Sequence, residues 1–242
     1  MLTVLRSTLV AFRDFVFPNI CFLCKENLNG NQLRICNKCW TEIPMLEYAS
    51  EELCEKRGQL HSMNVDDFTA CFLFEKNERL QDIVHQLKYE EKTSFGIALG
   101  KRVGGKLLSL PQFVSADYLI PIPLHKTKLK ERGYNQSDFI ARGISSVTKI
   151  SVATKFLSRT KYTQSQTKLK FQERRENVND VFVVKNKFQK EIANKTVLLV
   201  DDVITTGATV SSASSALKAS GAKNVYAVSA ALTALADGVK SI

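Results

Sequence analysis

The segment from Val200 to Thr209 combines two adjacent acids with a loop rich in threonine and glycine. Asp201 and Asp202 can accept hydrogen bonds from vicinal sugar hydroxyls, and their oxygens suit a hard cation such as Mg²⁺. Gly207 can adopt a positive φ and lets the backbone approach a ligand closely. The other loop residues offer hydroxyl or backbone N–H donors to phosphate oxygens: Val203, Thr205, Thr206, Ala208 and Thr209. Phosphate donors beside sugar acceptors predict a ribose 5-phosphate site, with the two acids as candidate catalytic residues.

A simpler interpretation is an ordinary strand-to-helix turn in which Asp and Thr act as caps. Capping needs one such residue, whereas the segment carries five. The apolar run 195–200 comes before the segment, and an Ala- and Ser-rich helix is expected from Val210 onward. In an open parallel sheet, ligands bind beyond the carboxyl ends of the strands, where a helix N-terminus favours phosphate. The functional interpretation is therefore preferred.

Four cysteines form two C-x2-C knuckles separated by eleven residues: Cys21, Cys24, Cys36 and Cys39. Two facing knuckles complete a tetrahedral sulfur shell suited to Zn²⁺, and a shell of four thiolates leaves no open position, so the expected role is structural. The alternatives are two disulfides or four unrelated thiols. Cys71 is expected in the core, and Cys54 and His61 are not assigned to metal.

The composition bounds the class of protein. The 242 residues carry a formal net charge of +10, with 44% apolar and 24% charged residues, which is the balance of a soluble globular protein. Phosphorylated small molecules or nucleic acid would be attracted to such a charge, although a basic protein without a polyanion partner fits it equally well.

The first residues, Met1 to Phe17, are apolar but are interrupted by Arg6, Arg13 and Asp14. We interpret them as a short amphipathic helix and not as a signal peptide. No later run reaches the ~20 apolar residues that a spanning helix needs. The expected location is therefore the reducing cytoplasm, which disfavours disulfides.

Apolar runs of strand length alternate with helical patterns along most of the chain. Strands are expected at 68–74, 117–122, 181–184, 196–200 and 225–231, and helices at 79–89, 95–110, 136–147 and 210–219. Such alternation predicts an α/β domain with a parallel sheet covered on both faces. The predicted organisation is an N-terminal helix and zinc ribbon at 1–50, a linker or degenerate second ribbon at 51–66, and the α/β domain at 67–242.

A basic stretch, Ser158 to Asn179, interrupts this domain. It holds Arg159, Lys161, Lys168, Lys170, Arg174 and Arg175 with little apolar material. A loop of this length in a compact domain is usually functional or disordered. The alternative is a solvated basic loop that binds nothing.

The segment Val200 to Thr209 resembles the PRPP-binding motif of type I phosphoribosyltransferases. The motifs that accompany it follow a fixed order: the cysteine knuckles, then 119–125 (LIPIPLH), 132–136 (RGYNQ), 157–159 (LSR), 164–169 and 175–178 (RENV). Together they are similar to the ComF family, amidophosphoribosyltransferase-like proteins associated with competence and DNA uptake. ComF proteins often carry a second cysteine ribbon, and here only Cys54 remains in that region.

The resemblance implies roles for several cations. A loop after an early strand holds pyrophosphate in phosphoribosyltransferases, which by position implies His125, Lys126, Lys128 and Arg132. The turn 132–136 has the alternative role of capping the following helix. The basic stretch takes the place of the flexible hood that closes over PRPP, with these candidates: Arg159, Gln164, Gln166, Arg174 and Asn177.

Three functions are consistent with these features. The first is binding of PRPP with Mg²⁺ and transfer of phosphoribose to an unidentified acceptor, with release of pyrophosphate. The second is a competence factor that binds single-stranded DNA, uses the PRPP site for ligand sensing and acts with other competence proteins. The third is a structural module that docks a partner through its zinc ribbon, for which the acids and the threonine loop would be unnecessary.

Overall fold

The computed structural model describes residues 19–30, 32–74, 77–89, 93–160 and 181–233. It divides into two compact units, Met1–Ile43 and Pro44–Ile242. The predicted N-terminal helix and nearly all of the basic stretch, including Arg174, lie outside the described residues. No helix among the described residues is long and apolar enough to cross a membrane.

The first unit is built around its two cysteine knuckles. After Cys21 and Cys24 the chain turns back at Lys25, which has a φ of 64°, and Ile20 pairs with Asn27 in an isolated bridge. The second knuckle begins helix α2 (Asn37–Thr41). These tight turns present the four sulfurs to one another.

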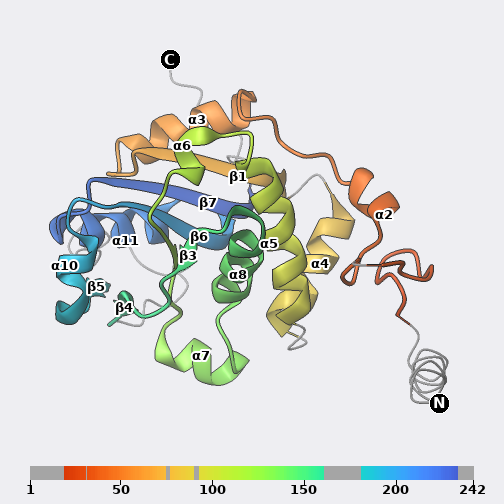
Figure 1. Ribbon diagram of the computed structural model, residues 1–242. Helices are drawn as coiled ribbons and strands as arrows, with labels where there is room; N and C mark the ends of the chain where they lie inside the picture. Colours follow the sequence, from red (N-terminus) through yellow and green to blue (C-terminus); the bar gives the residue numbers. More distant parts are fainter. Residues whose placement is uncertain (1–18, 31, 75–76, 90–92, 161–180, 234–242) are drawn as a thin grey trace, which may run out of the picture. The chain divides into compact units, whose positions relative to one another are not determined.

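The second unit contains a five-stranded sheet in the order β1-β7-β6-β2-β3, with every pair parallel (Figure 1). The strands are β1 (Asp67–Leu73), β2 (Tyr118–Pro121), β3 (Ser151–Val152), β6 (Thr196–Ile204) and β7 (Asn224–Leu232). The central strands are nearly continuous apolar runs, as expected where both faces are covered. The predicted parallel α/β fold is confirmed.

Helices α5 (Thr93–Leu107) and α8 (Gln136–Thr148) cover one face of the sheet. They cross closely because glycines meet at the contact: a Cβ on Gly100 would collide with the Ile140 carbonyl oxygen, and one on Gly143 with that of Ile97. In the chain, helix α4 (Glu78–Tyr89) precedes α5 and helix α6 (Pro111–Val114) follows it. The predicted helices at 79–89, 95–110 and 136–147 correspond to α4, α5 and α8.

The opposite face is covered by α3 (Glu51–His61) and α11 (Ala208–Ala219), with a small antiparallel pair, β4 (Leu157–Arg159) and β5 (Phe182–Val184). Val197 and Leu199 of β6 share one core cluster with Leu53, Leu60 and the apolar residues of α11. Alternate residues of a strand face opposite sides, which explains why Leu198 is absent from this cluster. Two short elements, η1 (Asn186–Phe188) and α10 (Gln189–Ile192), follow β5.

Three features differ from the expected elements. The region 51–66, expected to be a linker or degenerate ribbon, contains α3, whose Leu53 and Leu60 are fully buried in the domain core. The strand expected at 181–184 pairs with β4 outside the main sheet. Strand β6 continues four residues beyond Val200, because Val203 and Ile204 still pair with β7.

Candidate functional site

The two acids lie at the carboxyl end of β6, where the strand leads into the threonine loop. Gly207 has a φ of 84° and occupies the N-cap position of α11, and no side chain caps that helix. Of the first N–H groups of the helix, that of Ala208 donates to Thr206 Oγ1 at 3.4 Å, and those of the first turn have no intrahelical acceptor. A hollow of about 40 Å³ lies there, lined by Asp201 and by residues 203–210. Its size and its donors suit one phosphate group.

A larger cavity of about 180 Å³ borders the same acids. Its lining residues come from six elements and the loop after β2: Lys88, Ile122, Pro123, Leu124, Lys128, Arg132, Gln136, Ser137, Arg159, Asp201, Asp202 and Thr209. Asp201 and Thr209 line both the hollow and the cavity. The two spaces therefore adjoin at the acids, with four cations around the larger one.

Asp201 has an environment that opposes its ionisation. Burial, with the nearby charge of Asp202, raises the pKa of the Asp201 carboxyl to about 7. Ser137 Oγ donates to Asp201 Oδ1 at 3.2 Å, and the Asp202 backbone N–H donates to the same oxygen at 2.9 Å. Lys88 Nζ lies 3.3 Å from Asp202 Oδ2. Burial and the charge of Asp202 thus oppose the ionised form of Asp201, and a cation or sugar hydroxyls would favour it.

The structure brings together some of the predicted site residues and separates others. Arg132 and Arg159 line the larger cavity with the acids. His125 instead caps helix α7 (Lys126–Arg132) by accepting from the Thr127 N–H at 3.2 Å, and neither it nor Lys126 is among the lining residues. Arg174 lies outside the described residues.

Helix α7 explains this division. It has no buried residue and stands apart from the sheet (Figure 1). Residues four apart lie on the same face of a helix, so Lys128 and Arg132 share the face that lines the cavity. Lys126 is exposed.

Three polar lining residues were not in the ligand-binding set predicted from the sequence: Lys88, Gln136 and Ser137. Lys88 ends α4, more than 100 positions before the acids, and nothing in its local sequence indicates the site. Ser137 and Gln136 begin α8; the pattern 132–136 gave its residues either a functional or a capping role and did not include Ser137. Gln136 is 1% exposed, and its Nε2 donates no hydrogen bond within the described part of the chain. Such a buried amide beside a cavity is suited to a ligand acceptor.

The loop before α8 is held in place by Asn135. Its Nδ2 donates to the Ile122 carbonyl oxygen and to Asp138 Oδ1, both at 3.0 Å. This fixes the chain after β2 against the start of α8. The cavity wall is therefore held by hydrogen bonds of the Asn135 side chain.

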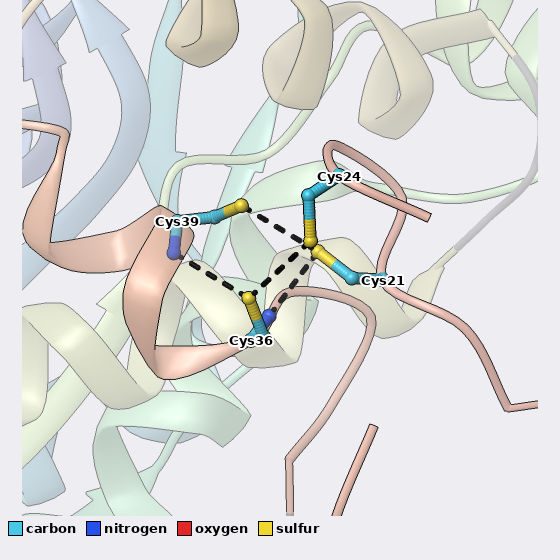
Figure 2. A group of neighbouring side chains, drawn as sticks. All are labelled: Cys21, Cys24, Cys36 and Cys39. Atoms are coloured by element: carbon cyan, nitrogen blue, oxygen red, sulfur yellow. Dashed lines mark hydrogen bonds between the residues drawn. The ribbon is translucent and has the colours of Figure 1, made fainter. Parts of the chain in front are cut away.

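The cysteine knuckles form a separate site in the first unit. Figure 2 shows the four sulfurs turned toward one another, and all lie within 4.8 Å. The Cys21–Cys39 and Cys24–Cys36 sulfur pairs are 3.8 and 3.7 Å apart. A tetrahedral shell with Zn–S bonds of about 2.3 Å has edges of about 3.8 Å, so the sulfurs fit this ion.

The surroundings of the sulfurs also suit a metal. The Cys36 N–H donates to Cys21 Sγ at 3.3 Å and the Cys39 N–H donates to Cys36 Sγ at 3.4 Å, which stabilises thiolate charge. Among the described residues no other group of three or more potential ligands gathers, and Cys54 is exposed on α3. The four cysteines therefore form a structural zinc site.

Family models match both the α/β domain and the cysteine region of the chain. Residues 132–238 match the family model of the phosphoribosyl transferase domain, and residues 12–72 match that of the double zinc ribbon domain. The second match extends through α3 into β1, whereas the described cysteine cluster belongs to one ribbon. The chain thus combines a parallel α/β fold similar to that of phosphoribosyltransferases with an N-terminal four-cysteine cluster consistent with a zinc ribbon.

Relatives along nearly the whole chain carry competence and DNA-related names. Competence protein F of Haemophilus influenzae is 27% identical over 227 residues, which cover 85% of this chain and 93% of the relative. DNA utilization protein YhgH of Escherichia coli O157:H7 is 24% identical and covers 86% and 94%. These homologues confirm the resemblance to the ComF family that the motifs indicated.

Among solved structures, the glutamine PRPP amidotransferase from B. subtilis, complexed with ADP and GMP, aligns with a TM-score of 0.40 and 19% identity. The alignment covers 60% of this chain and 30% of the amidotransferase chain.

Proposed function

We propose that the domain binds PRPP together with Mg²⁺ and transfers its phosphoribosyl group to an acceptor, releasing pyrophosphate, in a process connected with competence or DNA uptake. The observation that carries this proposal is the junction of the phosphate-sized hollow and the cation-lined cavity at Asp201 and Thr209. The 5′-phosphate is assigned to the hollow, the ribose hydroxyls to the acids, and the pyrophosphate to the larger cavity.

The chemistry needs the cations at one end of the ligand. The acceptor attacks C1 of the ribose as the bond from C1 to the pyrophosphate oxygen breaks, and the electron pair leaves with the pyrophosphate. Lys128 and Arg132 line the cavity in which that charge develops, and their charges stabilise it. Gln136 Nε2 adds a donor that needs no reorganisation.

The acids suit a magnesium ion as well as a sugar. Asp201 and Asp202 would hold it, because hard cations prefer carboxylate oxygens and because a cation would offset the burial and the repulsion that oppose ionisation of Asp201. When bound, the ion supplies neutralising charge to the departing pyrophosphate. The residues themselves orient the ribose.

Isothermal titration with PRPP and Mg²⁺ tests this proposal. PRPP should bind with clearly more heat and higher affinity than ribose 5-phosphate, and the double substitution Asp201→Asn with Asp202→Asn should abolish the PRPP signal. Asp117→Asn, at the amino end of the same sheet, is the matched control and should bind normally. Heat no greater than that of ribose 5-phosphate in the native protein would end the transferase interpretation.

A second candidate function, binding of single-stranded DNA, is favoured by one structural observation. Helix α7 exposes Lys126 and Lys130 and buries none of its residues, and several relatives are named DNA utilization proteins. Backbone charge would dominate such binding, so affinity should fall steeply between low and moderate salt. A filter-binding titration with an oligonucleotide at both salts decides it, since absent or salt-insensitive binding removes this candidate.

A further inference from the structure

A buried lysine lies beneath the phosphate loop. Lys56, in the middle of α3, is 0% exposed. Its Nζ donates to the Thr205 carbonyl oxygen at 2.6 Å and to Gln59 Oε1 at 2.8 Å. The segment 51–66, expected to be a linker or a degenerate second ribbon, therefore places an ammonium group against the first threonine of the loop, 149 positions away in the chain.

Both of these partners are neutral, which makes the lysine costly for the ligand-free fold. Burial lowers the pKa of Lys56, and the charge of Glu55 opposes this only in part. Replacing a buried charge by an apolar side chain of similar volume is often neutral or stabilising. A positive charge kept at this position therefore needs a reason other than stability.

The rest of α3 and the turn after it also support the loop and the helix that follows. Leu60 packs against Gly207, where an added Cβ would collide with Leu60 Cδ2. Ser211 Oγ of α11 donates to the Met63 carbonyl oxygen at 3.1 Å, and Ser214 Oγ donates to that of Asn64. The segment 56–64 thus packs against the start of α11 and supports it.

The geometry of the peptide unit links the lysine to the ligand side of the loop. Thr205 C=O and Thr206 N–H belong to one planar trans peptide, so the N–H points away from Lys56 when the carbonyl points toward it. Thr206 also lines the phosphate-sized hollow. An ammonium bound to the carbonyl polarises this peptide and strengthens its N–H as a donor.

From these contacts we infer that Lys56 is a positioning residue for phosphate recognition: it holds the Thr205 carbonyl away from the ligand and places a positive charge behind the bound phosphate. The inference rests on the proposed phosphosugar site and deepens it. It assigns part of the phosphate affinity to α3, which precedes the region 132–238 that matches the phosphoribosyl transferase model.

The test compares two probes by calorimetry, ribose 5-phosphate and pyrophosphate, on the full chain. Lys56→Met should weaken ribose 5-phosphate at least about tenfold, because a charged hydrogen-bond donor is lost. Pyrophosphate, expected at Lys128 and Arg132, should change by less than about threefold. The control Lys218→Met removes the same charge from the far end of α11, where Lys218 pairs with Asp66, and should leave both affinities unchanged.

Thermal unfolding of the ligand-free variant separates positioning from a general structural role. Lys56→Met should unfold at the native temperature or above it, and should lose the stabilisation that ribose 5-phosphate gives the native protein. If Lys56→Met does not fold, Lys56→Arg should keep ribose 5-phosphate affinity within about threefold while the uncharged Lys56→Gln loses it.

The outcomes are distinguishable. If the native protein binds ribose 5-phosphate and the charge-removing variants bind it equally well, the role of Lys56 is overturned and the proposed function stands. Equal losses for both probes together with a lowered unfolding temperature also overturn it, since the lysine would then be merely structural. If the native protein does not bind ribose 5-phosphate at all, the proposed site and the role of Lys56 fail together.

Discussion

Acidic side chains lie at both ends of the parallel strands, and their surroundings differ in kind. At the amino end, Asp117 accepts from Lys195 Nζ and from the Thr196 N–H, both at 2.9 Å. The hydrogen bond from Lys195 is the largest cause that lowers the pKa of Asp117. Asp66 likewise accepts from the Val225 N–H and pairs with Lys218. These acids are satisfied by the fold itself.

At the carboxyl end the acids also accept hydrogen bonds, from Ser137 and from backbone N–H groups, but burial opposes the charge of Asp201. Asp201 has its pKa raised to about 7 by burial and by the charge of Asp202, and Lys88 approaches only Asp202 closely. Ionisation of the acid is therefore favoured by the fold at one end of the sheet and opposed by burial at the other. Perturbed carboxyl groups in a cavity are typical of functional sites.

Removing zinc should have the largest effect on stability, and that effect should be confined to the cysteine unit, leaving the parallel sheet folded. A structural zinc ion can contribute on the order of 10 kcal/mol to so small a unit, so a chelator should unfold residues 19–43. Hydrogen exchange measured by mass spectrometry should show full exchange there and retained protection in β6 and β7. Loss of protection in those strands would contradict two separate compact units.

Substitutions of two glycines with similar φ values compare the carboxyl end of the sheet with its amino end. Gly207 and Gly221 have φ values of 84° and 87°, but only at Gly207 does an added Cβ collide, with Leu60, whereas at Gly221 the nearest atom is 3.6 Å away. Gly207→Ala should lower the free energy of unfolding by roughly 1–3 kcal/mol and abolish ribose 5-phosphate binding, because strain and collision add.

Gly221→Ala is the matched control for that substitution. It should cost about 1 kcal/mol from backbone strain alone and leave ligand binding intact. Denaturant unfolding measures the stability of the two variants, and calorimetry measures their affinity for ribose 5-phosphate. Equal affinity in both variants would show that the loop at Gly207 is not part of the binding site.

Neutralising one acid at each end should have opposite effects on stability. The folded-state pKa of Asp201 is raised, so the folded protein binds more protons than the unfolded chain between about pH 4 and pH 7, and stability falls as pH rises through that window. Asp201→Asn has no such ionisation. In magnesium-free buffer it should be more stable than the native protein at pH 8, by on the order of 1–3 kcal/mol, and equal to it near pH 4.

Asp117→Ala should instead lower stability at neutral pH, by about 0.5 kcal/mol, because its carboxylate is partly exposed and screened. Its folded-state pKa is lowered, so this contribution is lost as pH falls below 4. Urea unfolding at several pH values measures both variants. If both substitutions changed the free energy of unfolding in the same direction at pH 8, the proposed difference between the acids at the two ends of the sheet would be contradicted.

The smallest expected effect concerns Lys88, whose charge lowers the pKa of Asp201 against the larger effect of burial. Lys88→Met should raise that pKa further and change stability by less than about 1 kcal/mol. NMR titration of the Asp201 carboxyl carbon would show the higher midpoint. An unchanged midpoint would mean that Lys88 does not act on the acid pair.

Local patterns allowed the sequence to predict the cysteine knuckles and the strand, loop and helix around residues 201–209, because each places its groups within a few residues. Long-range contacts were not predictable in this way. Helix α3 buries Leu53, Lys56 and Leu60 on one face at helical spacing, but the lysine in the middle hides the apolar pattern. The contact of Lys88 with Asp202 arises only when α4 and β6 come together in the folded domain.

The most direct test of the phosphosugar site is a crystal structure of the protein with ribose 5-phosphate and Mg²⁺. Density for the phosphate should lie against the N–H groups of residues 206–209, with the ribose hydroxyls within hydrogen-bond distance of Asp201 and Asp202. A ligand bound elsewhere, with Lys88 still paired to Asp202 and the loop empty at saturating concentration, would contradict it.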